Sequence, residues 1–272
     1  MRRRCLAAGL LAVVCAGVPR TAVAQTKPEP QLLLTMFGGA LTGKVLYENL
    51  RQPLFLLEDP ASIDTLSLDR RLSPAIVLGA SATYFPSPAL GLTGEIVFLG
   101  FGLDDSCDMT YTAPGPPRPG SNEQICADIA SKSTSASTIG FYGGALYRPL
   151  RQGTVRPYLR AVAGIATRNR STVAVSGAYL TESATLQERL VIDDPDPGSL
   201  APSASFGLGF MIAFAPGYQA RLEFRDHLLY ADRVTGPANA FAEAPTERTL
   251  VNSMGLVLML DIVLEQRRGR RY

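Results

Sequence analysis

The chain has 272 residues, of which 46% are hydrophobic and 18% are charged, a composition that suits one large folded domain or two small ones. Its 26 basic and 24 acidic residues nearly balance, and the sequence shows no basic stripe of the kind that nucleic-acid-binding proteins carry. After the first 24 residues, no uninterrupted apolar run reaches the ~18–20 residues that a membrane-spanning helix requires, which excludes a helical membrane protein.

The first 24 residues have the three parts of a signal peptide. MRRRC supplies a positive start, LAAGLLAVVCAGV supplies an apolar core, and small residues precede a cut between Ala24 and Gln25. The alternative is an N-terminal membrane anchor, but the apolar run is shorter than a span requires. We therefore divide the chain into a signal peptide, residues 1–24, and one exported domain, residues 25–272. Loss of the four arginines of the signal peptide leaves 22 basic against 24 acidic residues.

Cleavage would leave two of the four cysteines, Cys107 and Cys126. Both lie in one loop-like segment, and the oxidising compartment of an exported protein favours a disulfide between them. Closing a loop of this size contributes on the order of 3 kcal/mol in the chain-entropy model. Two thiols with no nearby histidine match no zinc spacing, so we expect neither a metal site nor a cofactor.

Eight segments of alternating character follow one another along the exported domain. Successive residues of a strand point to opposite faces, so each segment would have one apolar face and one mixed face. In chain order the segments are residues 33–47, 74–85, 90–101, 138–148, 156–166, 203–214, 218–230 and 252–265. Each is roughly ten residues or more, long enough to cross a bilayer as a tilted strand. No stretch of helical period competes with them.

The apolar faces carry large aliphatic and aromatic residues, and the mixed faces carry Gly, Ser, Thr and a few charges. The first segment places on its apolar face Leu33, Phe37, Leu41, Val45 and Tyr47. The seventh alternates apolar residues with Gln219, Arg221, Glu223, Arg225 and His227, and only Asp226 breaks its apolar set. Small mixed faces suit the inside of a narrow closed barrel, whereas a soluble barrel would carry dense charge outside. We therefore expect the apolar faces to meet lipid.

The connections between segments alternate in length. They are short after the second, fourth and sixth segments, and long and rich in Pro, Asp, Ser and Thr after the first, third, fifth and seventh. Outer-membrane barrels show this sorting, with short periplasmic turns and long extracellular loops. Because an open edge in hydrocarbon would leave backbone groups unpaired, the sheet must close. The sequence thus predicts an all-β fold, a closed eight-stranded antiparallel up-and-down transmembrane β-barrel with both termini in the periplasm.

Charged residues on the mixed faces form a predicted lumen network. Its members are Lys44, Glu95, Arg160, Arg221, Glu223, Arg225 and Asp261. A lone buried charge is very costly, so we expect these groups to pair across the lumen. The alternative is that some of them extend into water beyond the membrane, and Arg225 is the best candidate for this. Arg148 is expected at the periplasmic mouth.

Aromatic residues near the segment ends predict two girdles at the membrane interfaces. Those beside the short turns are Tyr84, Phe85, Tyr147, Phe214 and Tyr218, and those toward the long loops are Tyr47, Phe101 and Tyr230.

Four stretches, GFYGGALYRPL, VRPYLRAVAGIA, SFGLGFMIAF and ARLEFRDHLLY, resemble the eight-stranded outer-membrane barrel family that includes the OmpA membrane domain and OmpX. The resemblance covers residues 31–266 and lies in residue type and spacing. It implies a cell outer membrane location, surrounding lipid and lipopolysaccharide, and insertion by the barrel assembly machinery. It also implies a non-enzymatic structural or surface-interaction role through the long loops. The lumen of such a barrel is filled by its own side chains, so no general pore is expected.

Two alternatives stay open. A small outer-membrane enzyme acting on lipid A or peptides would need an acid–base set near the outer rim, and His227, beside Asp226, is the one histidine available. A single histidine more often has a hydrogen-bonded rim or lumen role, so we expect no catalytic residue. The other alternative is a secreted lipocalin-like ligand-binding barrel, which would be soluble without detergent.

Overall fold

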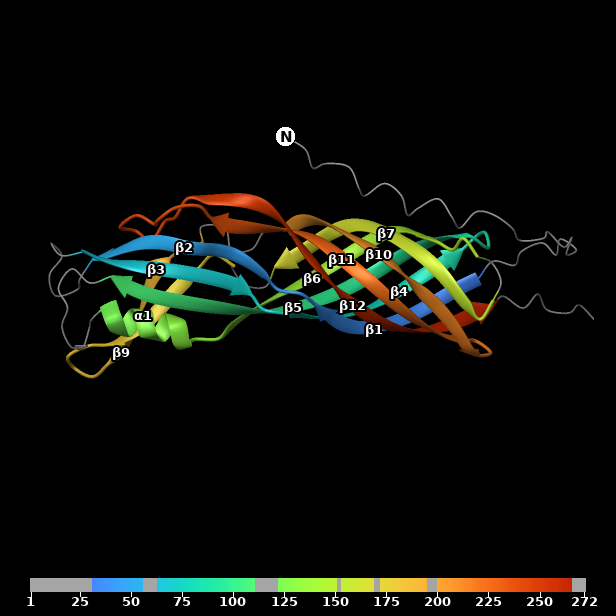
Figure 1. Ribbon diagram of the computed structural model, residues 1–272, viewed down its shortest axis with the longest axis horizontal. Helices are drawn as coiled ribbons and strands as arrows, with labels where there is room; N and C mark the ends of the chain where they lie inside the picture. The colour runs from blue at the N-terminus through green and yellow to red at the C-terminus, as the bar shows by residue number, and fades with distance from the viewer. Residues whose placement is uncertain are drawn as a thin grey trace, which may run out of the picture.

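Eight strands of the computed structural model form a closed ring. The structure describes residues 31–55, 63–110, 122–150, 153–168, 172–194 and 200–265, so the predicted signal peptide and its cut at Ala24 and Gln25 lie outside the described residues. The ring strands are β1 (Gln31–Leu41), β4 (Ala75–Phe85), β5 (Leu90–Thr110), β6 (Thr134–Tyr147), β7 (Val155–Arg168), β10 (Leu200–Ala215), β11 (Tyr218–Val234) and β12 (Thr246–Glu265). All ring pairings are antiparallel, and β1 pairs with β12 to close the ring (Figure 1). The predicted closed eight-stranded barrel is therefore confirmed.

The first predicted strand is broken in the structure. β1 ends at Leu41, and after Thr42 and Gly43 the chain resumes as β2 (Lys44–Phe55), which pairs with β3 (Ile63–Leu72). At the break the backbones of Gly43 and Leu72 lie close together, since a Cβ on Gly43 would lie 1.9 Å from the carbonyl oxygen of Leu72. β1 and β2 thus form one interrupted strand of a long hairpin, and β3 and β4 form the other.

The connections are sorted by length between the two ends of the barrel, as predicted. The joins β4–β5, β6–β7 and β10–β11 are short and lie at one end, which we call the short-turn end. Gln31 and Glu265, paired in register, lie there too. The opposite end carries the long connections, on the left of Figure 1. The described residues include no helix long and apolar enough to cross a membrane.

The long connections contain secondary structure that the sequence did not predict. Besides β2 and β3 they hold α1 (Asn122–Ser131), β8 (Val175–Leu180) and β9 (Leu186–Ile192). We call these elements, together with the outer part of β5 that pairs with β3 (Leu103–Thr110), the cap.

The cap has an apolar core that is continuous with the adjoining half of the lumen. Its buried members include Leu46, Tyr47, Leu50, Leu54, Leu66, Leu68, Ile125, Ile129, Val173, Val175, Val191 and Ile192. Burying a large aliphatic side chain contributes roughly 1.5–3 kcal/mol before the cost of ordering the chain. The cap is therefore a folded layer on the barrel.

Candidate functional site

The outer face of the ring is an apolar belt. Its exposed residues include Leu34, Met36, Ile76, Leu78, Leu92, Ile96, Phe98, Phe141, Leu159, Ile165, Phe206, Leu208, Phe210, Leu222, Phe224, Met254, Leu256, Leu258, Leu260, Ile262 and Leu264. Along β12 the belt runs from Leu264 to Met254, which spans about 26 Å at ~3.4 Å per residue and a tilt of ~40°. Transmembrane barrels carry an apolar band about 25 Å tall, so the belt has the height of a membrane core.

Aromatic residues border the belt at the short-turn end. Tyr84, Tyr147, Phe214 and Tyr218 are exposed there, and the Phe214 and Tyr218 rings stack with centroids 6.5 Å apart. Tyr230 is exposed toward the cap.

Three of the predicted girdle residues point inward instead. Tyr47, Phe85 and Phe101 are buried, so their assignment to the girdles was wrong. Phe85 follows the outward Tyr84, and strand alternation turns it into the lumen. There the guanidinium carbon of Arg148 lies 3.6 Å from its ring centroid. Arg148 itself lies at the short-turn mouth of the barrel, where the sequence predicted it.

The faces of β1 are the reverse of those predicted. Leu33, Phe37 and Leu41 are buried inside, whereas Met36 is 74% exposed. The inner wall makes room for Phe37 at Gly79, where a Cβ would lie 2.4 Å from the ring. Phe37 therefore fits inside the lumen because Gly79 on the neighbouring strand β4 leaves room for its ring.

The first half of the lumen network joins β5, β7 and β11. Arg160 donates from Nε and Nη2 to the two carboxylate oxygens of Glu95, at 2.6 Å each. Arg225 Nε donates to Glu223 Oε1 at 2.6 Å, and the Tyr158 hydroxyl donates to Glu223 Oε2 at 2.7 Å. Arg160 Nη1 lies 3.4 Å from Glu223 Oε1 and links the two pairs.

The second half centres on Asp261 of β12. Arg221 donates to Asp261 Oδ1 from Nε at 2.9 Å and from Nη2 at 2.6 Å. The Thr35 hydroxyl donates to the same oxygen at 2.7 Å, and Gln219 Nε2 donates to Oδ2 at 2.6 Å. Both carboxylate oxygens are thus satisfied, as a buried charge requires.

The structure brings together six of the seven predicted network residues, all of them buried. Arg225, the candidate for extension into water, is fully buried among them. The six supply three positive and three negative charges, which balance. The prediction was wrong for Lys44, which does not lie in the lumen network. It begins β2 beyond the break, is exposed, and donates to Asn252 Oδ1 at 2.8 Å.

An apolar layer fills the lumen between this network and the short-turn end. It consists of Leu33, Phe85, Leu146, Tyr158 and Met211. Network and layer together occupy the cross-section with side chains, as expected for eight strands.

His227 lies deep in the lumen on β11. Its side chain is fully buried, neither ring nitrogen has a hydrogen-bond partner, and its ring meets that of Tyr142 edge-on with centroids 6.3 Å apart. An acid–base catalyst needs a hydrogen-bonded partner and access to substrate, and His227 has neither. Within the described ranges, no group of three or more His, Cys, Asp or Glu residues could hold a metal ion.

A closed eight-stranded ring with an apolar exterior and paired charges inside is the architecture of a small transmembrane β-barrel. No protein-family model matches the chain, and no curated protein matches it. Three solved structures are similar over most of their length. The N-terminal β-barrel domain of OprF from Pseudomonas aeruginosa is 11% identical, covering 86% of this chain and 97% of that one, with a TM-score of 0.35. Neisserial surface protein A is 10% identical, with 85% and 96% covered and a TM-score of 0.40. Ail of Yersinia pestis is 9% identical, with 87% and 99% covered and a TM-score of 0.38. The fold assignment rests on the strand pairing of this chain itself.

Proposed function

We propose that this protein is an integral outer-membrane β-barrel that presents a folded cap at the cell surface and acts by binding rather than by catalysis or diffusion. The belt supports a membrane location, since it would expose a wide apolar surface to water in a soluble barrel. Lipid and lipopolysaccharide would surround it, and the barrel assembly machinery would insert it. The filled lumen supports a role other than a general pore.

The order of the cap is the observation that carries the binding role. Arg70 of β3 donates from Nε and Nη2 to the Asp105 carboxylate of β5 at 2.5 and 2.6 Å. Its Nη1 donates to the carbonyl oxygens of Thr172 and Ala174 at 3.0 and 2.9 Å. One buried side chain thereby fixes three segments that are distant in the sequence.

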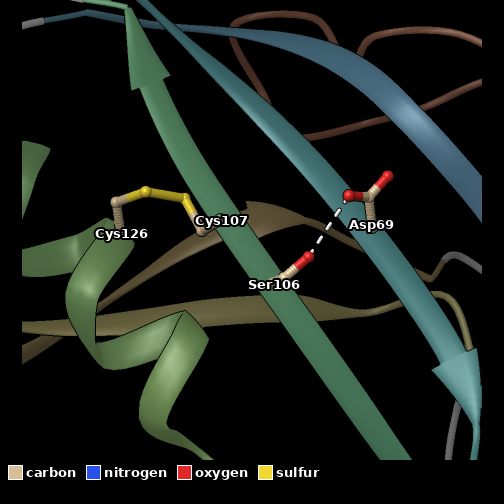
Figure 2. The surroundings of a disulfide bond; sticks show 4 residues. All are labelled: Asp69, Ser106, Cys107 and Cys126. Carbon is tan, nitrogen blue, oxygen red and sulfur yellow. Dashed lines mark hydrogen bonds between the residues drawn. A yellow bond between two sulfur atoms is a disulfide. The ribbon is translucent and has the colours of Figure 1, made fainter.

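A disulfide fixes the cap helix. Cys107 of β5 and Cys126 of α1 are bonded, with their Cα atoms 5.4 Å apart (Figure 2). Beside the bond, Ser106 Oγ donates to Asp69 Oδ2 of β3 at 3.2 Å. Asp128 of α1 in turn accepts from the backbone N–H of Ala178 on β8 at 2.7 Å.

Such a preordered surface loses little conformational entropy when a partner binds. The cap side also exposes large apolar side chains, among them Leu186 at 69% and Phe241 at 81%. Exposed aromatic and aliphatic groups on an otherwise polar surface are typical of interaction sites.

The membrane location can be tested by fractionation. The mature protein should appear in the outer-membrane fraction, resist extraction without detergent, and migrate differently on gels before and after boiling. Recovery as a soluble protein without detergent would overturn the proposal and favour the lipocalin-like alternative.

The absence of a general pore needs a separate test. Purified protein in planar bilayers should give no steady conductance of the size that open porins give. Sustained large openings by the intact chain would contradict the filled lumen.

A further inference from the structure

The barrel wall has a slit on its cap side. The register between β1 and β12 ends at Leu41 and Gly255, and one more backbone hydrogen bond, from Thr42 N–H to the Met254 carbonyl oxygen at 2.7 Å, continues the closure. Beyond that pair β12 continues toward Thr246 bonded to β11, while β2 is bonded to β3. In the described part of the chain, no strand pairs with this edge of β12. Ser253 Oγ also donates to the Thr42 carbonyl oxygen at 2.6 Å, so the slit lies between residues 246–252 and the beginning of β2, which starts at Lys44.

A cavity lies behind the slit, in the half of the lumen nearest the cap. Four neighbouring strands, β6, β7, β10 and β11, each contribute one alanine to its wall, namely Ala136, Ala166, Ala201 and Ala231. Short side chains at one level of a barrel leave a void. The void has a volume of about 40 Å³. That volume holds only a few carbon atoms of a hydrocarbon chain and is too small for a sugar headgroup.

The cavity wall is mostly apolar, which decides what could occupy it. Leu72, Phe101, Leu229 and Val251 add apolar side chains to it, and Thr138, Thr172 and Ser253 add a minority of polar surface. Apolar cavities stay dry and take up apolar molecules, because water inside them finds too few hydrogen-bond partners.

The mouth of the cavity opens at the margin of the belt. Lys44 and Tyr230 line the cavity and are exposed on the outer face. Met254 is the last belt residue of β12 before the slit, and the wall opens just beyond its hydrogen bond to Thr42. A molecule that enters here would come from the lipid, because the cap core covers the lumen from above.

The mouth carries a charge that could hold a headgroup. The Lys44 ammonium is exposed and donates to the neutral amide of Asn252. The Asp226 carboxylate on the same face interacts electrostatically with Lys44. The Lys44 ammonium thus favours an anionic headgroup, and the Asp226 carboxylate, which has the opposite effect, keeps that preference modest.

We propose that the slit and cavity bind one hydrocarbon chain of an amphiphile with an anionic headgroup, taken from the outer leaflet, with a few carbon atoms of the chain among the four alanines and the headgroup at Lys44. The site rests on the proposed membrane location. It goes beyond that proposal because it assigns a ligand class to this part of the lumen.

The chain contains no tryptophan, so a single introduced indole reports one position. Phe101→Trp places the reporter in the cavity, and Phe98→Trp, on the lipid face of the same strand, is the matched control; the two phenylalanines are 8% and 40% exposed. The probe is 11-bromoundecanoic acid in detergent micelles, since bromine quenches indole fluorescence only at close range. Quenching of the Phe101→Trp fluorescence should reach a plateau as the bromo acid is added. Quenching of the Phe98→Trp fluorescence should instead rise in proportion to the fraction of bromo acid in the micelles.

Second substitutions separate the cavity from the surface. Ala201→Leu fills the cavity and should reduce saturable quenching at least fivefold, whereas Ala204→Leu, outward on the same strand, should leave it unchanged. Lys44→Gln should weaken the bromo acid about three- to tenfold and leave 11-bromoundecanol unaffected.

Two results would overturn this proposal alone. One is an unquenched Phe101→Trp reporter in a protein that still shows the heat-modifiable gel shift. The other is an equal effect of Ala204→Leu and Ala201→Leu. If Phe101→Trp does not fold, Val251→Trp reports from the facing wall. Soluble behaviour of the mature chain would instead overturn the proposed function.

Discussion

At the residue scale, the buried pair of Arg160 and Glu95 is doubly hydrogen-bonded between strands β7 and β5. Removing one member of such a pair leaves an uncompensated charge in a dry environment, which costs more than the pair itself contributes. The network as a whole is balanced, so each member depends on the others.

Glu95→Gln should destabilise the barrel by about 3–5 kcal/mol, because Arg160 keeps its charge without its carboxylate. Urea unfolding followed by the heat-modifiable gel shift would measure this. Glu48→Gln is the matched control, since Glu48 pairs with Arg71 at 3.5 Å on the exposed cap and should change stability by less than about 0.5 kcal/mol. Equal effects of the two substitutions would contradict the buried network.

Tyr47, in the cap core, gives a pH-dependent prediction. Burial raises the pKa of its hydroxyl to about 12, against the opposing influence of the Arg70 charge. Between the ordinary tyrosine pKa near 10 and this value, the unfolded chain loses the proton and the folded chain keeps it. Cap stability should therefore fall as pH rises through this window, by roughly 2–3 kcal/mol in all.

Tyrosinate absorbance at 295 nm would test this prediction. The difference between the native chain and Tyr47→Phe isolates one titration, which should be complete only near pH 12. Protease sensitivity of the cap should rise over the same window in the native chain and less in the variant. A difference titration centred near pH 10 would contradict the buried placement of Tyr47.

At the element scale, the disulfide couples α1 to β5 without touching the belt. Cys107→Ser with Cys126→Ser should loosen α1 by on the order of 3 kcal/mol, since the bond closes a short loop. Limited proteolysis should then cut near residues 122–131, while the gel shift of the barrel stays. A reductant should produce the same cleavage in the native chain and should not increase cleavage of the double variant. Loss of the barrel itself would show that cap and barrel fold as one unit.

Alternation along the strands was enough to predict all eight ring strands, because a membrane barrel sorts its two faces by polarity over ten residues or more. It did not predict where β1 ends. The break at Thr42 and Gly43 sends Lys44 out of the lumen. The cap elements escaped prediction because their core comes from long-range packing, and α1, with its sequence NEQICADIAS, is too short and too weakly patterned to stand out.

The lumen network, like the fold, was predictable from the sequence only in part. Alternation placed Glu95, Arg160 and Arg221 inside, because each lies on the face opposite the large apolar residues of its strand. It could not say which charges pair, since that depends on the stagger of strands that are distant in the sequence. The reversed faces of β1 have a further cause. Leu33 belongs to the apolar layer near the short turns, where large apolar groups point inward.

At the scale of the whole molecule, the belt predicts how a charge on the outer face is tolerated. Leu258 lies midway along the belt on β12. Leu258→Arg should lower the free energy of unfolding by about 2–4 kcal/mol, because the charge would lie near the bilayer centre. Tyr230→Arg, at the margin, should cost about 0–1 kcal/mol. Folding titrations into lipid vesicles would measure both. Similar small costs at the two positions would mean that water, not lipid, surrounds the belt.

Three ring strands pass from the belt beyond the barrel without interruption: β5 with 21 residues, β11 with 17 and β12 with 20. Their ladder hydrogen bonds lie perpendicular to the strand direction. A pulling force on the cap end would therefore load many of these bonds in shear at once rather than break them one after another. Because the same strands carry both the cap end and the belt, such a force would pass directly to the part of the barrel that carries the belt.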